Sequence, residues 1–181
     1  MKFYLKLGAI LLLIASIASG ILAVVNNLTD PIIKNNQLET EKLARKEVLS
    51  LAITFEEKID KDFKYYCGKD DNGKIVGYTF VAFGPGYSST IKTMVGVNLD
   101  FSIENIKIIY QAETPGLGAN CSNPDFPDRF KTLTVKDMKV DKDGGKIASI
   151  TGATISTRAI SDSINKGLTS LIKAVTNKEG K

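Results

Sequence analysis

Two short stretches of this 181-residue chain combine residue types that suit a bound phosphate and a flat ligand. The first, Ser149 to Thr154 (SITGAT), places hydroxyl groups and Gly152 between an expected strand and the start of the last expected helix. The N–H groups at a helix start lack partners within the helix, and the helix dipole adds to their attraction for an anion. The stretch therefore predicts a phosphate site beside a hydroxyl. A simpler interpretation is that Gly152 permits the turn and that Ser156 or Thr157 caps the helix.

The second stretch is the loop Glu113-Thr114-Pro115-Gly116-Leu117-Gly118, which follows an expected strand ending near Tyr110. Its proline fixes a turn, and its glycines lack the Cβ that would hold a flat ligand away from the backbone. A tight loop without a ligand is the alternative. A third glycine-containing stretch, from Gly84 to Ser88, is expected to connect two strands, with Tyr87 as a candidate ligand contact.

Composition excludes several other functions. The net charge is only +4 and the lysines are interspersed with acidic residues, so the chain has no basic stripe for nucleic acid. The absence of histidine removes every catalytic triad of the Ser-His-Asp type and the commonest metal ligand. Cys67 and Cys121 are too few for an iron–sulfur cluster within this chain, and their state, two free thiols or one disulfide, stays open.

The N-terminal segment is expected to span a membrane. Leu7 to Val25 is free of charged residues, and as a helix it would extend about 28 Å, close to the thickness of a hydrocarbon core. Lys2 and Lys6 precede the run and no basic residue follows it before Lys34, so the N-terminus is expected in the cytoplasm and the remainder outside. A cleaved signal peptide gives the same orientation, and a buried core helix is the weakest alternative.

The remaining residue patterns predict an α+β fold with a mainly antiparallel sheet flanked by helices. The turn Asp71-Asn72-Gly73 suits a hairpin. The expected domains are 1–25 (cytoplasmic N-terminus and transmembrane helix), 26–55 (linker and helix) and 56–181 (extracytoplasmic domain). The expected elements are a helix over 37–52, strands over 63–67, 74–83, 91–99, 106–110, 132–140 and 146–150, and a last helix that includes 160–175.

Three motifs occur in a characteristic order behind the single membrane span: GPGYSSTIKTMVGV at 84–97, ETPGLGANC at 113–121 and SITGATIST at 149–157. In this order they closely resemble the FMN-binding domain of the G subunit of the Rnf electron-transport complex, over essentially the whole chain. The related C subunit of the sodium-pumping NADH:quinone reductase shares the domain but is usually longer.

The resemblance implies a covalent FMN, joined through its phosphate by a flavin transferase to the last residue of an [ST]-G-A-[ST] motif, here Thr154. We further expect Arg158 or a nearby lysine to favour the reduced, anionic flavin. The family commonly has an aspartate where this chain has Ala148, although Asp141 and Asp143 lie a little upstream. The implied cofactor-binding residues are Thr154, Thr151, Gly152, Ala153, Ser156, Glu113, Thr114, Pro115, Gly116, Leu117 and Gly118, with Gly116 to Gly118 lining the ring and Glu113 and Thr114 holding the loop.

The resemblance also implies a function, that of an electron carrier in a cell-membrane complex that couples ferredoxin:NAD⁺ electron transfer to Na⁺ or H⁺ transport. The expected partners are the membrane, the other integral-membrane subunits of the complex and, during maturation, the flavin transferase. No independent active site is expected in this chain, and neither is a metal or nucleic acid. The alternatives are a membrane-tethered structural or binding module without flavin, and the C subunit of a sodium-pumping reductase.

Overall fold

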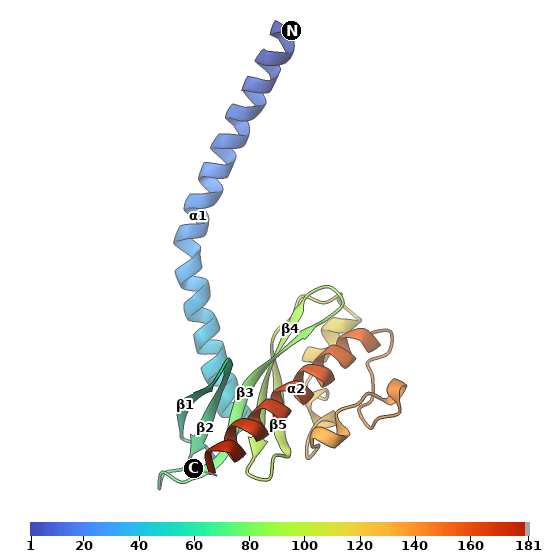
Figure 1. Cartoon of the computed structure of the whole chain (residues 1–181). Helices are drawn as coiled ribbons and strands as arrows, with labels where there is room; N and C mark the ends of the chain where they lie inside the picture. The colour runs from blue at the N-terminus through green and yellow to red at the C-terminus, as the bar shows by residue number, and fades with distance from the viewer. Residues whose placement is uncertain (180–181) are drawn as a thin grey trace. The chain divides into compact units, whose positions relative to one another are not determined.

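The computed structural model describes residues 1–179, and the side chains of residues 1–176. The chain divides into two compact units, with the second beginning at Glu41. Figure 1 labels the helices and strands, which are α1 (Lys2–Val48), β1 (Thr54–Asp60), β2 (Phe63–Lys69), β3 (Ile75–Pro85), β4 (Thr90–Asn98), β5 (Ile103–Tyr110) and α2 (Thr154–Glu179). Short 3-10 turns lie between β5 and α2, namely η1 (Gly118–Ser122), η2 (Pro127–Arg129), η3 (Val135–Asp137) and η4 (Asp141–Asp143).

Helix α1 joins the two helical segments expected near the N-terminus into one helix of 47 residues. The polar stretch over 26–36 does not interrupt it, although Pro31 lacks the N–H for one helical bond. The Thr29 hydroxyl donates to Val25 O at 2.9 Å, and Lys34 pairs with Asp30 one turn earlier, so local contacts support the helix here. This helix is long and apolar enough to cross a membrane.

A five-stranded antiparallel sheet forms the centre of the second unit, in the order β1-β2-β3-β4-β5. Strands β2 to β5 confirm the four strands expected over 63–110. Strand β1 was not expected, because its charged residues (TFEEKID) obscure the alternation of an edge strand in which no residue is fully buried.

Helices cover both faces of this sheet. Helix α2 packs on one face so closely that a Cβ on its Gly167 would lie 2.1 Å from the Phe80 ring. The last turns of α1 pack on the other face, where Ala44 and Val48 contact Met94. The large core lies between the sheet and α2, and the smaller one lies under the end of α1. The α+β prediction is confirmed.

The strands expected over 132–140 and 146–150 are wrong. Asp137 accepts bonds from the N–H and the hydroxyl of Thr134, and this capping box closes the turn η3 in the middle of the first expected strand. Within residues 1–179, β pairing between the two stretches is limited to one parallel bridge, between Val140 and Ile147. The alternation of Leu133 and Val135 was too short to distinguish a strand from a turn. Both side chains pack against the core even though the backbone here forms a turn.

Candidate functional site

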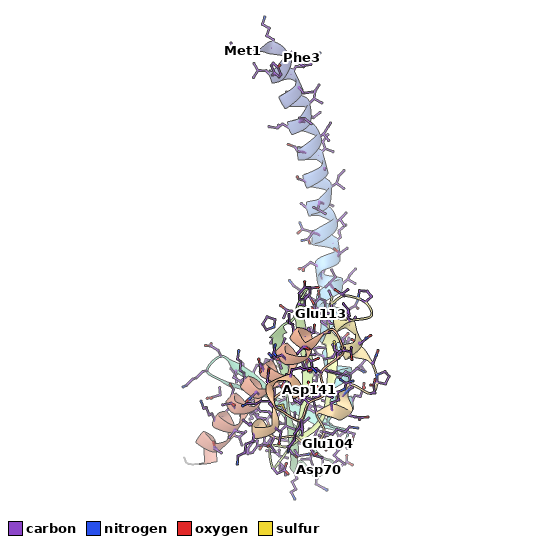
Figure 2. The ribbon with its side chains drawn as sticks, turned by 90° about the vertical axis from the view of Figure 1, so that its right-hand side faces the viewer. Met1, Phe3, Asp70, Glu104, Glu113 and Asp141 are labelled. Atoms are coloured by element: carbon purple, nitrogen blue, oxygen red, sulfur yellow. The ribbon has the colours of Figure 1, made fainter. Side chains whose placement is uncertain are left out.

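One pocket of about 480 Å³ lies at the C-terminal end of β5 and the start of α2. In Figure 2, Glu113 marks this end of the folded unit, whereas Asp70 and Glu104 lie at the opposite end. Three segments distant in sequence supply the lining: the β3–β4 loop, the loop after β5 and the turn into α2. The lining residues are Tyr87, Glu113, Thr114, Leu117, Gly118, Gly152, Ala153, Thr154, Ile155 and Ser156.

The pocket unites most of the residues expected from the sequence, with some exceptions. Thr151, Pro115 and Gly116 do not line it, and all three are exposed in their turns. Tyr87 lines it, as expected for a ligand contact. Ile155 was missed, and the only signal for it was an exposed apolar residue directly after the TGAT motif.

Thr154 is the first residue of the 26-residue helix α2 and lines the pocket. Gly152 allows the chain to turn into the helix, because its φ of +74° is one that L side chains rarely adopt. Ala153 O accepts the first helical bond, from Thr157 N at 3.1 Å. The Thr154 hydroxyl makes no hydrogen bond to any residue that the structure describes, so it is free to react or to bind a ligand.

The interpretation of Ser156 or Thr157 as a helix cap is wrong. The Thr157 hydroxyl lies one turn inside the helix, where it donates to Ala153 O and accepts from Ile150 N, both at 3.1 Å. The Ser156 hydroxyl donates away from the helix, to Glu113 Oε2 at 2.6 Å. The residue before the helix is Ala153, which has no side-chain oxygen with which to cap it. The N–H groups of the first turn are therefore left for a ligand or water.

Glu113 holds the three segments of the pocket together. Its side chain accepts bonds from the backbone N–H of Tyr87 at 3.1 Å and from those of Ser88 and Ser89 at 2.9 Å. With the Ser156 hydroxyl, these donors bind the β3–β4 loop and α2 to one carboxylate, which is only 6% exposed. Glu113 was expected to hold its own loop, and the bonds of its side chain instead fasten the β3–β4 loop and α2 to that loop.

The donors around Glu113 also determine its charge. Burial alone would raise the pKa of this carboxyl group, but the bonds from Ser156 and from the three N–H groups outweigh it, and the pKa lies below its usual value. Glu113 is therefore an anion at neutral pH.

Gly118 is required by the close approach of the loop to this carboxylate. A Cβ at this position would lie 2.6 Å from Ser156 Oγ and 2.7 Å from Glu113 Oε2, inside any normal contact. The loop can therefore meet α2 only through a glycine here.

Arg158 or a nearby lysine was expected beside the flavin, but neither Arg158 nor a lysine is among the described residues that line the pocket. The Arg158 guanidinium forms two bonds with Asp143, at 2.7 and 2.8 Å, and both side chains remain about two-fifths exposed. The bonds from Arg158 hold the pKa of Asp143 below its usual value. Arg158 lines a smaller neighbouring pocket instead, of about 190 Å³.

The residues around Ala148 are held by side chains from other segments. Ala148 O accepts a bond from Arg129 at 2.7 Å, and Asp141 accepts bonds from the N–H and the hydroxyl of Ser149. Asp141 thus fastens the turn just ahead of TGAT, although it is not at the position of the usual aspartate.

Comparisons with known proteins identify two matching family models and several relatives. Residues 86–169 match the model of the FMN-binding domain, and residues 1–48 match that of the RnfG N-terminal region. The chain is 34% identical to the G subunit of an ion-translocating oxidoreductase complex from Methanosarcina acetivorans, over 90% of this chain and 92% of the relative. It is 35% identical to the G subunit of the Na⁺-translocating ferredoxin:NAD⁺ oxidoreductase complex from Acetobacterium woodii, over 92% and 91% of the two chains.

Solved structures support the same fold. The C subunit of the Na⁺-translocating NADH-quinone reductase from Parabacteroides distasonis matches with a TM-score of 0.58 and 19% identity, over 77% of this chain and 94% of that chain. The NqrC structure from Shewanella oneidensis matches with a TM-score of 0.51 and 21% identity, over 70% and 74%. The membrane-length helix, the pocket and these relatives together show that this membrane-anchored chain belongs to the family of G subunits of the ion-translocating Rnf oxidoreductase complex.

Proposed function

We propose that this chain is an electron carrier within a membrane-bound, ion-translocating complex of the ferredoxin:NAD⁺ oxidoreductase type, and that it holds FMN through a phosphoester on Thr154. The observation that carries the proposal is the place of Thr154. Its uncommitted hydroxyl lies at the start of a long helix and inside the pocket. A family of FMN-binding domains matches the residues that form this pocket.

The residues of the pocket suit both the phosphate and the ring of FMN. Beside Thr154, the uncapped first turn of α2 offers N–H groups and the positive end of the helix dipole to a phosphate. Leu117, Ile155 and Tyr87 offer apolar and aromatic surface to the flavin ring. The volume of about 480 Å³ lies within the range of about 300–1,000 Å³ that is usual for small-molecule sites. When bound, the flavin would supply the electron chemistry, and the protein would orient it and exclude water.

Orientation follows from the charges around the apolar segment. With Lys2 and Lys6 before the span, the N-terminus stays in the cytoplasm and the pocket lies outside. We accordingly assign 1–25 to the cytoplasmic N-terminus and the membrane, 26–55 to the connection and 56–181 to the extracytoplasmic FMN domain. A flavin transferase would have to act on that side, and the electron-exchange partners would be other integral-membrane subunits of the complex.

Relatives with similar sequences are named for different ions. The Acetobacterium woodii protein is named as sodium-translocating, and a relative from Clostridium ljungdahlii, 30% identical, is named as proton-translocating. Ion choice therefore belongs to the multi-span partners, because a single span without a charged residue offers no pathway.

The direct test is expression of the full chain in a host with an export route and a flavin transferase, followed by in-gel flavin fluorescence under denaturing conditions and intact mass. The wild-type protein should show a fluorescent band and the added mass of one FMN. Thr154→Ala should lose both, because the acceptor oxygen is gone. Thr154→Ser should keep both, because it retains a hydroxyl at the same place.

Thr176→Ala is the matched control, since it removes an exposed threonine hydroxyl of the same helix that lies outside the TGAT motif and outside the pocket lining. It should leave the band unchanged. A fluorescent band that survives Thr154→Ala would move the attachment site to another residue. A wild-type protein without flavin would instead favour a membrane-tethered module that binds no cofactor.

A further inference from the structure

The pocket carries one unbalanced negative charge. Glu113 lines it as a buried carboxylate, and no lysine or arginine is among the lining residues that the structure describes. The expected cation, Arg158, points to Asp143 instead. The charge in contact with a ligand here is therefore opposite in sign to the one the sequence suggested.

The groups around Glu113 do not cancel this charge. All of its donors are neutral, namely the Ser156 and Ser89 hydroxyls and the N–H groups of Tyr87, Ser88 and Ser89. Neutral donors stabilise the ionised form of a carboxyl group and orient it, but its net charge remains. Because Glu113 is buried, water screens that charge far less than it screens an exposed side chain.

We propose that Glu113 sets the reduction potential of the flavin low, by placing a fixed negative charge against the cofactor while it also fastens the pocket. This inference rests on the proposed function, because it requires FMN in this pocket. The physical reason is direct. Reduction adds electrons to the ring, so a neighbouring anion raises the free energy of the reduced form relative to the oxidised form.

A merely structural role predicts something different. If Glu113 only held the segments together, then loss of a bond to its carboxylate would loosen the site as much as loss of its charge. Ser156 allows the two roles to be separated. Ser156→Ala removes the bond at 2.6 Å and leaves the carboxylate charged. Glu113→Gln removes the charge and keeps nearly the same shape, but its NH₂ group replaces one of the two acceptor oxygens. Glu113→Asp is therefore needed beside it, because it keeps the charge while its shorter side chain disturbs the same bonds.

The experiment is a spectroelectrochemical titration of the full-length, flavin-loaded protein in mild detergent at pH 7, with FMN attachment verified by intact mass in each sample. Glu113→Gln should raise the ratio of reduced to oxidised flavin about tenfold at a fixed applied potential. For a two-electron couple, this corresponds to a rise of the midpoint potential by about 30 mV. Ser156→Ala should give a clearly smaller shift. Glu113→Asp should restore a potential below that of Glu113→Gln, since it restores the charge.

An unchanged potential in Glu113→Gln, or an equal shift in Ser156→Ala, overturns the inference and leaves FMN attachment intact. Wild-type protein without flavin overturns the proposed function, and the inference with it.

If Glu113→Gln does not fold, a second pair of variants tests the inference. Leu117 lines the pocket and is 43% exposed, so it tolerates a polar side chain. Leu117→Lys should raise the potential relative to Leu117→Gln, because the cation offsets Glu113. Equal potentials in the two variants would contradict the inference.

Discussion

Two carboxylates bind the first turns of α2, and they differ in almost every physical respect. Glu113 is buried, and only neutral hydroxyl and N–H groups donate to it. Asp143 is 43% exposed and forms an ion pair with Arg158, which has a positive charge and donates two hydrogen bonds. By charge alone, the ion pair would be the stronger of the two contacts.

Burial reverses that order. An exposed ion pair gains little, because water solvates both partners nearly as well when they are apart. A buried carboxylate leaves its donors without any partner when it is removed, and each such group then bears its full desolvation cost. The pocket is thus held by Glu113, and the pair between Asp143 and Arg158 adds little to the outside of the helix.

The largest effect should come from Glu113→Ala. It leaves the N–H groups of Tyr87, Ser88 and Ser89 without their acceptor, so we expect the free energy of unfolding to fall by about 2–4 kcal/mol. Thermal unfolding of the full chain in detergent, followed by near-UV circular dichroism, measures the loss. Asp143→Ala is the matched control. An equal loss in both variants would contradict the claim that the buried carboxylate stabilises the fold more than the exposed one.

A smaller loss is expected from Gly118→Ala. The added methyl group would overlap Ser156 Oγ and Glu113 Oε2, and such overpacking typically costs about 1–3 kcal/mol. The double variant Gly118→Ala with Ser156→Ala should recover part of this loss in the same unfolding experiment, because the nearest atom is then absent. Additive losses would show that the two sites do not touch in solution.

The stability that Glu113 contributes should depend on pH. The folded pKa of Glu113 lies below the usual 4.5, so its contribution is present above that pH and is lost as pH falls through the folded pKa. Melting temperatures of wild type and Glu113→Gln should therefore differ most at neutral pH and converge as pH falls below about 4.5. A gap that stays constant down to about pH 3 would show that the charge of Glu113 does not contribute to stability.

Sequence patterns predicted those elements whose apolar residues recur with the period of a strand or of a helix. Strands β2 to β5 alternate clearly, and the apolar residues of α2 recur at helical spacing, so these elements were expected nearly as observed. The charged edge strand β1 and the turns over 132–150 were not, because their structure depends on neighbouring segments: β1 on pairing with β2, and the turns on the capping box at Thr134.

The site shows the same limit. The motifs identified the two segments that meet, but spacing along a chain cannot show which side chain bonds to which. Ser156 was expected either to contribute to the cofactor site or, with Thr157 as the other candidate, to cap its own helix, and its hydroxyl donates to Glu113, 43 positions away in the sequence. Arg158 or a nearby lysine was expected at the ligand, but the Arg158 guanidinium forms an ion pair with Asp143 on η4 and does not line the pocket. Only the folded arrangement reveals these pairings.

The smallest effect should come from breaking the exposed pair. Arg158→Gln removes one partner of an ion pair whose members are both about two-fifths exposed, so the melting temperature should change by about 1–2 °C at most. The flavin potential should also stay within the error of the titration, because Arg158 does not line the pocket. Asp143→Asn should behave alike, since both variants break the same contact. A marked fall of potential in Arg158→Gln would mean that the guanidinium leaves Asp143 when FMN is bound, and that the sequence-based expectation for this residue holds in the loaded protein.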